Sequence, residues 1–348
     1  MSSFIKVGIN GFGRIGRTVF RSLLHHPQIQ VVAINDLAEI NTMAHLLKYD
    51  SIHGVLDASV SVSEQALVVN NRQFKYTSEK ELDQLEWKGV DVVIEATGKF
   101  KTKSALQKHL QAGAQRVILS VPPEDDDIKM IVLGVNEQLL DSSDTIISNA
   151  SCTTNNVAPM VKIVDDLCGI QQAYITTIHS YTTDQSLHDQ PHRDLRRARA
   201  AGQSIVPTTT GAAKALTRIF PKLASVIGGC GIRVPVANGS LTDITFNVQK
   251  PPTIERINEA FRIASEGPMK GILQYTEDPI VSVDIVGNTH SCIFDAGMTS
   301  VIGTMVKIIG WYDNEKGYSS RIVDLILQFS RKWLYLSPKY VWVNELSC

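Results

Sequence analysis

The chain has 348 residues, of which 43% are hydrophobic and 20% are charged, an ordinary composition for a globular protein. This length exceeds one typical hydrophobic core and predicts two domains. A formal net charge of −1 opposes any general attraction to nucleic acid or to an anionic membrane. No apolar run approaches the roughly 20 residues of a membrane-spanning helix, so we expect no membrane association.

The start of the chain and its cysteines indicate a cytoplasmic protein. The sequence MSSFIKVGING leads directly into a strand pattern, so we expect no secretory signal. The 5 cysteines are an odd number and include no Cys-x-x-Cys pair, which fits a reducing compartment better than a disulfide framework or a zinc site. His188 and His192 have the spacing of a zinc-binding pair, but Pro191 opposes a regular helix there, so we expect no metal.

A glycine-rich motif follows the first predicted strand, residues 4–9. It reads Gly-Phe-Gly-Arg-Ile-Gly over residues 11–16 and runs into a stretch with helical spacing that ends at Pro27. A second predicted strand, residues 29–34, is followed by Asp36, about 20 residues after Gly16. A strand, this motif, a helix and a distal acid together form the context that a dinucleotide fingerprint requires.

Each residue of this fingerprint has a physical role. Gly11 allows a tight turn, Gly13 lets the backbone approach a pyrophosphate, and Gly16 allows close packing of helix and strand. The start of the helix favours the anionic pyrophosphate. Asp36 would accept hydrogen bonds from the ribose hydroxyls and repel a 2′-phosphate, which predicts NAD rather than NADP as the cofactor.

The rest of the first half continues the same fold. A helical pattern at 44–48 precedes alternating stretches at 58–63 and 66–69, and Asn70-Asn71 predicts a hairpin turn. A nearly continuous apolar strand, 90–96, ends in Thr97-Gly98 at the edge where open α/β sheets bind ligands. Further strands are expected at 115–120 and 130–132. The pattern predicts a Rossmann-type, doubly wound parallel sheet that ends near Asn149. The candidate cofactor-binding residues in this half are Gly11, Gly13, Arg14, Ile15, Gly16, Asp36, Thr97, Gly98 and Ser120.

Cys152 lies where a buried strand passes into a helix. The apolar run 145–147 precedes the polar segment Ser-Asn-Ala-Ser-Cys-Thr-Thr-Asn-Asn, and helical spacing extends from Cys152 to about residue 167. A helix N-terminus favours a thiolate over a thiol, and the thiolate is the reactive form. The alternative is a buried, inert cysteine, which the polar neighbours oppose.

The second half contains further candidate residues. His179 follows a predicted strand at 173–177, and a histidine together with a cysteine at the ends of buried elements indicates nucleophilic catalysis. The arginine-rich loop 187–202 has three interpretations: a solvated surface, an anion or subunit contact, and, least favoured, a nucleic-acid contact. Hydroxyl residues and a glycine at 208–214 suggest a phosphate cradle at a helix start, and Arg233 in an apolar strand requires an anionic partner.

The predicted elements of this half form an α+β domain. Strands at 241–248, 293–295 and 305–312 have the alternation of an antiparallel sheet with one covered face. Helices are expected at 252–264 and, as the last element, at 319–329. Pro159 lies inside the helix that follows Cys152 and should kink it near Asn155.

These motifs together resemble the phosphorylating glyceraldehyde-3-phosphate dehydrogenases. The resemblance extends over nearly the whole chain, and its most specific motifs are SNASCTTN and WYDNEKGYSSR. The others are INGFGRIGR, NDL, KYDSIHG, EATG, HSYTTDQ, PHRDLRRARAA, PTTTGAAKA and RVPVAN. The family fold implies an NAD-binding domain, residues 1–150, joined by a returning helix, 317–330, and a catalytic domain, 151–316.

The resemblance also implies a role for individual residues. Cys152 matches the nucleophile and His179 its base, while Asn314 matches the residue that holds the nicotinamide carboxamide, with Tyr318 beside it. The remaining matches concern two phosphate sites: Thr182, Asp184 and Arg233 for the substrate phosphate, and Ser151, Thr153, Thr210 and Gly211 with nearby Arg197 for inorganic phosphate. The resemblance implies glyceraldehyde 3-phosphate, inorganic phosphate and NAD as ligands, and a homotetramer.

Some features depart from the family pattern. Asn156 stands where a second cysteine is frequent, residues 121–127 are unusually acidic, and Gln190 before Pro191 replaces a common leucine. The resemblance ends near Gln328, and the tail 331–348 has no assigned role.

Two alternatives to a phosphorylating enzyme remain at this point. Erythrose-4-phosphate dehydrogenase is a relative that hydrolyses its thioester, but Thr182 and the Thr210-Gly211 pair fit the phosphorylating enzyme better. The second alternative is a non-catalytic binding protein with the same fold, which the intact Cys152 and His179 oppose.

Overall fold

The computed structural model describes residues 4–334, which group into two compact units. The first unit contains the residues up to Ile131, the segment Glu137–Asn149 and the residues from Ile322 onward. The second contains Val132–Asn136 and Ala150–Arg321. The predicted tail, 331–348, lies outside the described residues from position 335 onward.

The first unit is built on a nine-stranded sheet with the order β10-β11-β9-β8-β1-β2-β7-β6-β5. All neighbours from β10 to β7 pair in parallel, which confirms the predicted doubly wound sheet. The strands are β1 (Ile5–Asn10), β2 (Ile29–Asn35), β5 (Val60–Ser63), β6 (Ala66–Val69), β7 (Arg72–Thr77), β8 (Val92–Glu95), β9 (Arg116–Leu119), β10 (Lys129–Met130) and β11 (Ile146–Ser148).

The end of this sheet is antiparallel, because β5, β6 and β7 form consecutive hairpins. Asn70 and Asn71 join β6 to β7 with φ angles of 48° and 61°, which is the left-handed conformation that asparagine tolerates in tight hairpin turns. The turn predicted from the Asn-Asn pair is therefore confirmed, and the hairpin extends the parallel sheet by two strands.

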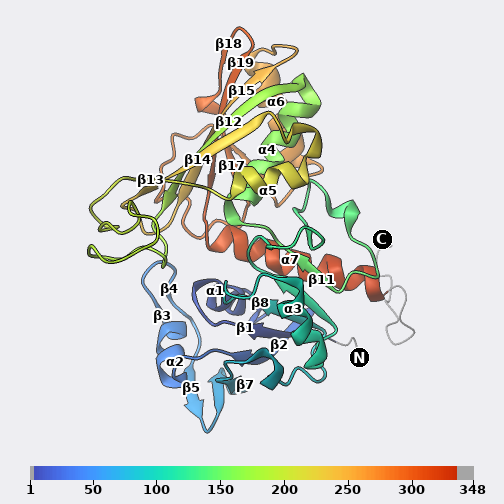
Figure 1. Ribbon diagram of the computed structural model, residues 1–348, viewed down its shortest axis with the longest axis vertical. Helices are drawn as coiled ribbons and strands as arrows, with labels where there is room; N and C mark the ends of the chain where they lie inside the picture. Colours follow the sequence, from blue (N-terminus) through green and yellow to red (C-terminus); the bar gives the residue numbers. More distant parts are fainter. Residues whose placement is uncertain (1–3, 335–348) are drawn as a thin grey trace. The chain divides into compact units, whose positions relative to one another are not determined.

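The helices that contact the first sheet include α1 (Arg14–Leu23), α2 (Ile40–Lys48) and α3 (Lys103–Gln111). Helix α1 contacts β2, α2 contacts β5 and α3 contacts β9. Figure 1 shows the three helices around the strands of this unit. Val19, Phe20 and Leu23 recur at helical spacing and form the buried side of α1. Short elements complete the unit: β3 (Tyr49–Asp50), β4 (Gly54–Val55), and 3₁₀ turns at Leu82–Gln84 and Glu137–Leu139.

The second unit contains an eight-stranded sheet with the order β13-β14-β12-β15-β19-β17-β16, and β18 pairs with β19. The pairs β15–β19 and β17–β19 are antiparallel, as predicted. The pair β12–β15 is also antiparallel, whereas β12–β14 and β16–β17 are parallel. The strands are β12 (Ile170–Ser180), β13 (Val206–Thr208), β14 (Ile227–Val234), β15 (Ser240–Val248), β16 (Leu273–Thr276), β17 (Cys292–Asp295), β18 (Ser300–Ile302) and β19 (Met305–Tyr312).

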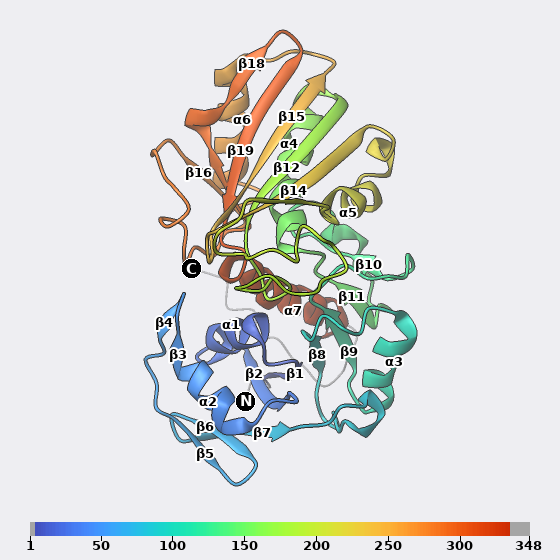
Figure 2. The same ribbon diagram turned by 60° about the vertical axis from the view of Figure 1, so that its left-hand side comes forward.

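One face of this sheet is covered by helices. Alternate residues of β15, from Ser240 to Val248, are buried while those between them are half-buried, which is the period of a sheet with one covered face. Figure 2 shows α4 (Cys152–Cys168), α5 (Ala212–Ile219) and α6 (Ile254–Glu266) on the covered side. The first turn of α4 lies against the ends of β12 and β19, where Cys152 contacts His179 and Thr153 contacts Tyr312.

Several observed limits differ from those predicted. β12 continues to Ser180, so His179 lies within the strand rather than after it. The last helix, α7 (Lys316–Leu334), begins earlier and extends further than predicted, and it belongs to the second unit up to Arg321 and to the first from Ile322. Val132–Asn136 groups with the second unit, because Gly134 packs against Ile272 and Met269.

No helix within residues 4–334 is both long enough and apolar enough to cross a membrane.

Candidate functional site

The glycine-rich loop between β1 and α1 has the geometry that its sequence predicts. Gly11 has a φ of +94°, and a Cβ atom there would lie 2.6 Å from the Thr97 nitrogen. A Cβ atom on Gly16 would lie 2.1 Å from the Gly11 carbonyl oxygen, so only glycine permits this close approach of helix and loop. Gly13 is the N-cap of α1 and has no side chain to cap the first turn, whose N–H groups suit an anion.

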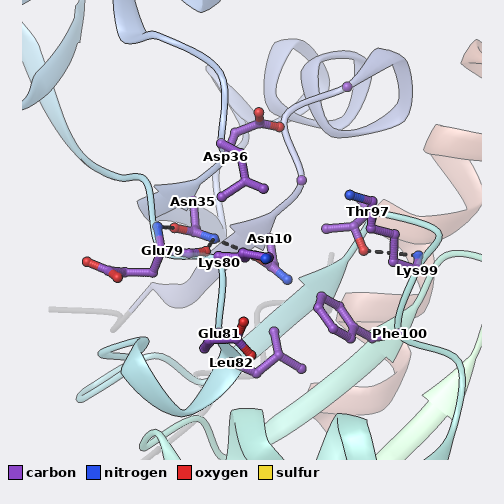
Figure 3. Close-up of a pocket in the computed structure, with 14 residues that line it drawn as sticks. Asn10, Asn35, Asp36, Glu79, Lys80, Glu81, Leu82, Thr97, Lys99 and Phe100 are labelled. Atoms are coloured by element: carbon purple, nitrogen blue, oxygen red, sulfur yellow. Dashed lines mark hydrogen bonds between the residues drawn. The ribbon is translucent and has the colours of Figure 1, made fainter.

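A cavity of about 440 Å³ opens beside this loop in the first unit. Of the predicted cofactor residues, Gly11, Gly13, Asp36 and Thr97 line it. Figure 3 shows that Asp36 lies above Asn35 and Asn10 while Phe100 lies on the opposite side, next to Lys99. An apolar ring next to strand-end polar groups and a helix start is chemically suited to the adenosine part of a dinucleotide.

Asp36 has two functions in this geometry. Its Oδ2 accepts a hydrogen bond from the Phe12 nitrogen at 2.6 Å, and its Oδ1 accepts one from the Ala38 nitrogen at 2.9 Å. The carboxylate thus fixes the glycine-rich loop from the end of β2. Since each carboxylate oxygen can accept more than one hydrogen bond, Asp36 retains capacity for ribose hydroxyls. The N–H groups at the start of α1 and the Asp36 carboxylate therefore fit the pyrophosphate and a ribose of NAD.

Other predicted cofactor residues lie outside the lining of the cavity. Arg14 forms a two-pronged ion pair with Asp50, at 2.7 and 3.1 Å, so its side chain is engaged elsewhere. Ile15 and Gly16 belong to the first turns of α1. Gly98 has a φ of +69° in the turn after β8, and the Ser120 nitrogen donates to the Glu95 carbonyl oxygen.

Several lining residues were missed by the sequence analysis. They are Asn10, Asn35, Leu37, Glu79, Lys80, Glu81, Leu82, Ala96, Lys99 and Phe100. Asn10 and Asn35 carry a signal that could have found them, because each is the last residue of a parallel strand. Lys99 and Phe100 directly follow the predicted Thr97-Gly98 turn.

A buried polar network supports this edge of the first sheet. The side chains of Glu95 and His109 are both fully buried, with His109 Nε2 3.0 Å from Glu95 Oε2. Asn10 Nδ2 donates to the same oxygen at 2.6 Å, while the nitrogen and the hydroxyl of Thr97 donate to Oε1. Trp87 Nε1 donates to His109 Nδ1 at 3.0 Å. Because Nδ1 accepts, the proton of a neutral imidazole is on Nε2 and points to the carboxylate.

In the second unit, a strained turn precedes Cys152. Ala150 has a φ of +54°, an uncommon backbone conformation for a residue other than glycine. The Tyr318 hydroxyl donates to the Ala150 carbonyl oxygen at 3.0 Å, so this predicted cofactor residue holds the turn. Ser151 caps α4 by accepting from the Thr154 nitrogen at 3.1 Å. Cys152 is thereby fixed as the first residue of the helix.

Cys152 and His179 lie within contact distance although 27 residues separate them in the chain. The Sγ atom of Cys152 is 3.5 Å from Nε2 of His179. The helix start supplies the thiol and β12 supplies the imidazole. A sulfur and an imidazole nitrogen at this distance can exchange a proton, which is the arrangement of a nucleophile and its base.

The other ring nitrogen of His179 has two neighbours. Nδ1 is 2.7 Å from the Ser180 carbonyl oxygen and 2.8 Å from Nη1 of Arg233, which itself donates to the same carbonyl at 2.9 Å. Burial, reinforced by the charge of Arg233, lowers the pKa of His179 to about 3. The imidazole is therefore neutral at physiological pH and can accept a proton.

The surroundings of Cys152 act on its thiol in two directions. Burial raises the pKa of the Cys152 thiol, while the positive charge of Arg233 and hydrogen bonds at the helix start lower it. Burial is the largest of these effects, so the pKa of the thiol is raised overall although the helix start acts in the predicted direction. Ionisation of Cys152 instead requires a nearby proton acceptor, and His179 Nε2 is in position for this.

Arg233 is a candidate anion-binding residue in the second unit. Burial lowers the pKa of its guanidinium, and Asp184 and Cys152 raise it. No carboxylate among residues 4–334 lies within ion-pair distance of Arg233, whose Nη1 instead contacts His179 and Ser180. A half-buried cation of this kind suits an anionic ligand.

The predicted substrate residues Thr182 and Asp184 are brought together with Arg197. The Thr182 hydroxyl donates to Asp184, and Arg197 forms an ion pair with the same carboxylate. Arg197 also donates to the Thr208 hydroxyl at 2.9 Å and to the Thr209 carbonyl oxygen at 3.2 Å. The arginine-rich loop is thus tied to β13, and residues predicted for two phosphate groups share one hydrogen-bonded cluster.

The remaining phosphate candidates lie at two helix starts. Ser151 and Thr153 belong to the start of α4, where the Thr153 hydroxyl is 2.9 Å from that of Tyr312. Gly211 is the N-cap of α5, and the Thr210 hydroxyl accepts from the Ala212 nitrogen at 3.2 Å. Helices α4 and α5 contact each other, and each start favours an anion.

The described residues contain no cluster of three or more His, Cys, Asp or Glu side chains suited to a metal ion.

Two family profiles match this chain. Residues 5–103 match the profile described as the NAD binding domain of glyceraldehyde 3-phosphate dehydrogenase, and residues 151–314 match its C-terminal domain.

Curated proteins are similar to this chain over almost its whole length. It is 52% identical over 334 residues to glyceraldehyde-3-phosphate dehydrogenase of Geobacillus stearothermophilus, and the aligned residues cover 95% of this chain and 99% of that protein. It is 50% identical over 333 residues to glyceraldehyde-3-phosphate dehydrogenase 1 of Bacillus cereus, covering 94% and 99%. A Mycobacterium avium protein of the same name is 51% identical over 331 residues, covering 92% and 97%.

Proposed function

Because the chain belongs to the glyceraldehyde-3-phosphate dehydrogenase family, we propose that Cys152 and His179 are the nucleophile and the general base of its reaction. The protein is an NAD-dependent enzyme of glycolysis that oxidises D-glyceraldehyde 3-phosphate with inorganic phosphate to 1,3-bisphosphoglycerate. The family, activity and cofactor predicted from the sequence are thus confirmed. The observation that carries the proposed roles is the 3.5 Å contact between Cys152 Sγ and His179 Nε2.

The first step joins the substrate to the enzyme. His179 accepts the Cys152 thiol proton as sulfur attacks the aldehyde carbon and returns it to the developing alkoxide oxygen, which gives a hemithioacetal and leaves the imidazole neutral again. His179 then takes the proton of the hemithioacetal hydroxyl while the former aldehyde hydrogen leaves with both bonding electrons. NAD, when bound, accepts that hydride. The product on Cys152 is a thioester.

The second step releases the product. An oxygen of inorganic phosphate attacks the thioester carbon, the carbon–sulfur bond breaks, and the sulfur leaves as thiolate. The acyl phosphate retains the free energy of oxidation that hydrolysis of the thioester would lose. The N–H of Cys152 and the imidazole of His179 would stabilise the oxyanion that develops in both steps.

The base role requires one of the two tautomers of His179. When Nδ1 carries the proton, it donates to the Ser180 carbonyl oxygen at 2.7 Å and leaves a lone pair on Nε2. When Nδ1 accepts from Arg233, Nε2 carries the proton and can stabilise a thiolate instead. Substrate binding at Arg233 would engage the guanidinium and favour the first tautomer.

The anion-binding residues of the second unit can be divided between two phosphate groups. We assign the substrate phosphate to Thr182, Asp184 and Arg233, since the guanidinium is half-buried beside the reacting pair. We assign inorganic phosphate to Ser151, Thr153, Thr210 and Gly211 with nearby Arg197. Two helix starts and an arginine supply complementary charge for this second anion.

Other assignments follow from the family. We propose that the first unit binds NAD through Gly11, Gly13, Arg14, Ile15, Gly16, Asp36, Thr97, Gly98 and Ser120, and that Asn314 binds the carboxamide with Tyr318 beside it. We further propose that the enzyme is a cytoplasmic homotetramer and that neither nucleic acid nor a membrane is its partner. Unpaired cysteines at 152, 168, 230 and 292 are compatible with a reducing compartment.

Erythrose-4-phosphate dehydrogenase, the alternative from the sequence, is not favoured, because the similar curated proteins are named glyceraldehyde-3-phosphate dehydrogenase. A non-catalytic binding protein is opposed by the geometry of Cys152 and His179.

The deciding experiment follows NADH absorbance with glyceraldehyde 3-phosphate and NAD, with and without inorganic phosphate. We expect sustained turnover that depends on phosphate. Turnover without phosphate dependence would indicate the hydrolysing relative and contradict the anion assignments. No turnover under either condition would contradict the pairing of Cys152 with His179.

A further inference from the structure

The side chain of Asn314 is held by three donors. It lies between β19 and α7 and is only 7% exposed. Its Oδ1 accepts from the Ser180 hydroxyl at 2.9 Å, from the Ser240 hydroxyl at 2.9 Å and from the Gly239 nitrogen at 3.2 Å. An amide nitrogen in the place of this oxygen would face a backbone N–H and compete with two hydroxyl donors. The three donors therefore select one orientation of the amide.

The other end of the same amide is left as a donor. Within residues 4–334, Asn314 Nδ2 has no hydrogen-bond partner. Because Oδ1 is consumed by three donors, the side chain can offer only N–H groups to a ligand. A group of this kind recognises a carbonyl oxygen and discriminates against a donor in the same place.

Ser180 and Ser240 are themselves fixed. Ser180 ends β12 and Ser240 begins β15, and their exposed fractions are 0% and 1%. The Ser180 nitrogen donates to the Ser240 hydroxyl at 3.1 Å, which leaves the hydroxyl hydrogen of Ser240 to point to Asn314. The Ser180 carbonyl oxygen also accepts from Arg233 at 2.9 Å. Both hydroxyls therefore belong to a rigid buried framework.

We propose that Ser180 and Ser240 are positioning residues that lock the Asn314 amide, so that it presents a hydrogen-bond donor to the carbonyl oxygen of the nicotinamide carboxamide. This rests on the proposed role of Asn314 in binding that group. Ser180 then has two roles. Its carbonyl oxygen contacts His179, the proposed general base, and its hydroxyl orients the Asn314 amide that binds the nicotinamide. Loss of both hydroxyls leaves only the Gly239 nitrogen, at 3.2 Å, to hold the amide, so the orientation is selected much less strongly.

The test compares the dissociation constants of NAD and ADP-ribose, which lacks the nicotinamide, for the full-length enzyme and its variants. We expect Ser180→Ala/Ser240→Ala to raise the dissociation constant of NAD about tenfold, the equivalent of losing one to two hydrogen bonds, and to leave that of ADP-ribose unchanged. Ser291→Ala is the matched control, because Ser291 is buried and its hydroxyl has no partner among the described residues. It should change neither constant.

A second ligand distinguishes orientation from a general loss of structure. The 3-acetylpyridine analogue of NAD keeps the ring carbonyl and lacks the amide N–H groups. A locked donor contacts only the carbonyl, so the wild-type enzyme should lose little by this replacement. In the double variant, a rotated Asn314 can accept from the carboxamide, and the ratio of the analogue's dissociation constant to that of NAD should rise about threefold. A structural defect would change both constants equally.

Failure of the lock and failure of the proposed function give different results. If Asn314→Ala leaves the NAD to ADP-ribose ratio unchanged, Asn314 does not bind the nicotinamide and the premise is wrong. If Asn314→Ala raises that ratio while Ser180→Ala, Ser240→Ala and the double variant do not, the positioning role is overturned. The single variants remain decisive if the double variant does not fold.

Discussion

The Nη1 atom of Arg233 lies 2.8 Å from Nδ1 of His179, inside hydrogen-bond distance, although the two residues are 54 positions apart. Parallel pairing of β12 and β14 sets them opposite each other in register. The cation and burial together keep the imidazole neutral, since the pKa of His179 is lowered to about 3.

This shift predicts a pH dependence of stability. As the pH falls below the ordinary histidine pKa of about 6.5, the unfolded chain binds a proton at His179 and the folded chain does not. The free energy of unfolding should therefore be unaffected by this group above about pH 6.5 and should fall as the pH is lowered from about 6.5 towards 3. Urea unfolding of wild type and His179→Gln between pH 7 and 5 measures it. Equal slopes for the two proteins would contradict the assignment.

Replacement of the nucleophile should separate chemistry from cofactor binding. A serine hydroxyl is far less ionised than a thiol, so Cys152→Ser should lower kcat by at least about a thousandfold. The dissociation constant for NAD should change little. Cys230→Ser is the matched control, because Cys230 is also partly exposed in the second unit and should leave kcat unaltered. Loss of NAD binding in Cys152→Ser would mean that the site is misassigned.

Asp36 should determine the choice between NAD and NADP. Asp36→Asn keeps an acceptor for one of the two backbone nitrogens at 2.6 and 2.9 Å while removing the charge that repels a 2′-phosphate. We expect the NAD to NADP ratio of kcat/KM to fall about tenfold, a change of about 1.4 kcal/mol. Glu64→Gln removes an equal charge from an exposed turn and serves as the control. An unchanged ratio in Asp36→Asn would show that this carboxylate does not set the preference.

Glu95→Gln should destabilise the first unit strongly. Every hydrogen-bond partner of the Glu95 carboxylate within residues 4–334 is a donor, and an amide nitrogen would face two of them in a fully buried place. Trp87 prevents relief by the other tautomer of His109, because its Nε1 donates to Nδ1. We expect the free energy of unfolding to fall by about 2–4 kcal/mol in urea titrations. Glu86→Gln, which loses an exposed ion pair with Lys75, should have little effect, and equal effects of both variants would refute the argument.

Much of the architecture could be read from local patterns. The dinucleotide fingerprint could be recognised from one contiguous stretch of strand, glycine motif, helix and distal acid. Its glycines are required by close contacts with nearby backbone atoms. The start of α4 at Cys152 was also local, since a capping serine precedes it. Element limits were less certain, and β12 extends to Ser180 because pairing with β14 and β15 continues the strand.

Residue types and short spacings were enough to predict the fold class, the cofactor fingerprint and the candidate reactive side chains, because these features are local in the chain. The contacts between these residues depend on the tertiary structure. The register of β12 and β14 places Arg233 beside His179. The end of β12 places Ser180 beside Asn314. Glu95 and His109 are buried together and contact each other. These contacts join residues far apart in the chain, and hydrophobic periodicity specifies which face is buried but not which distant strand supplies the neighbour.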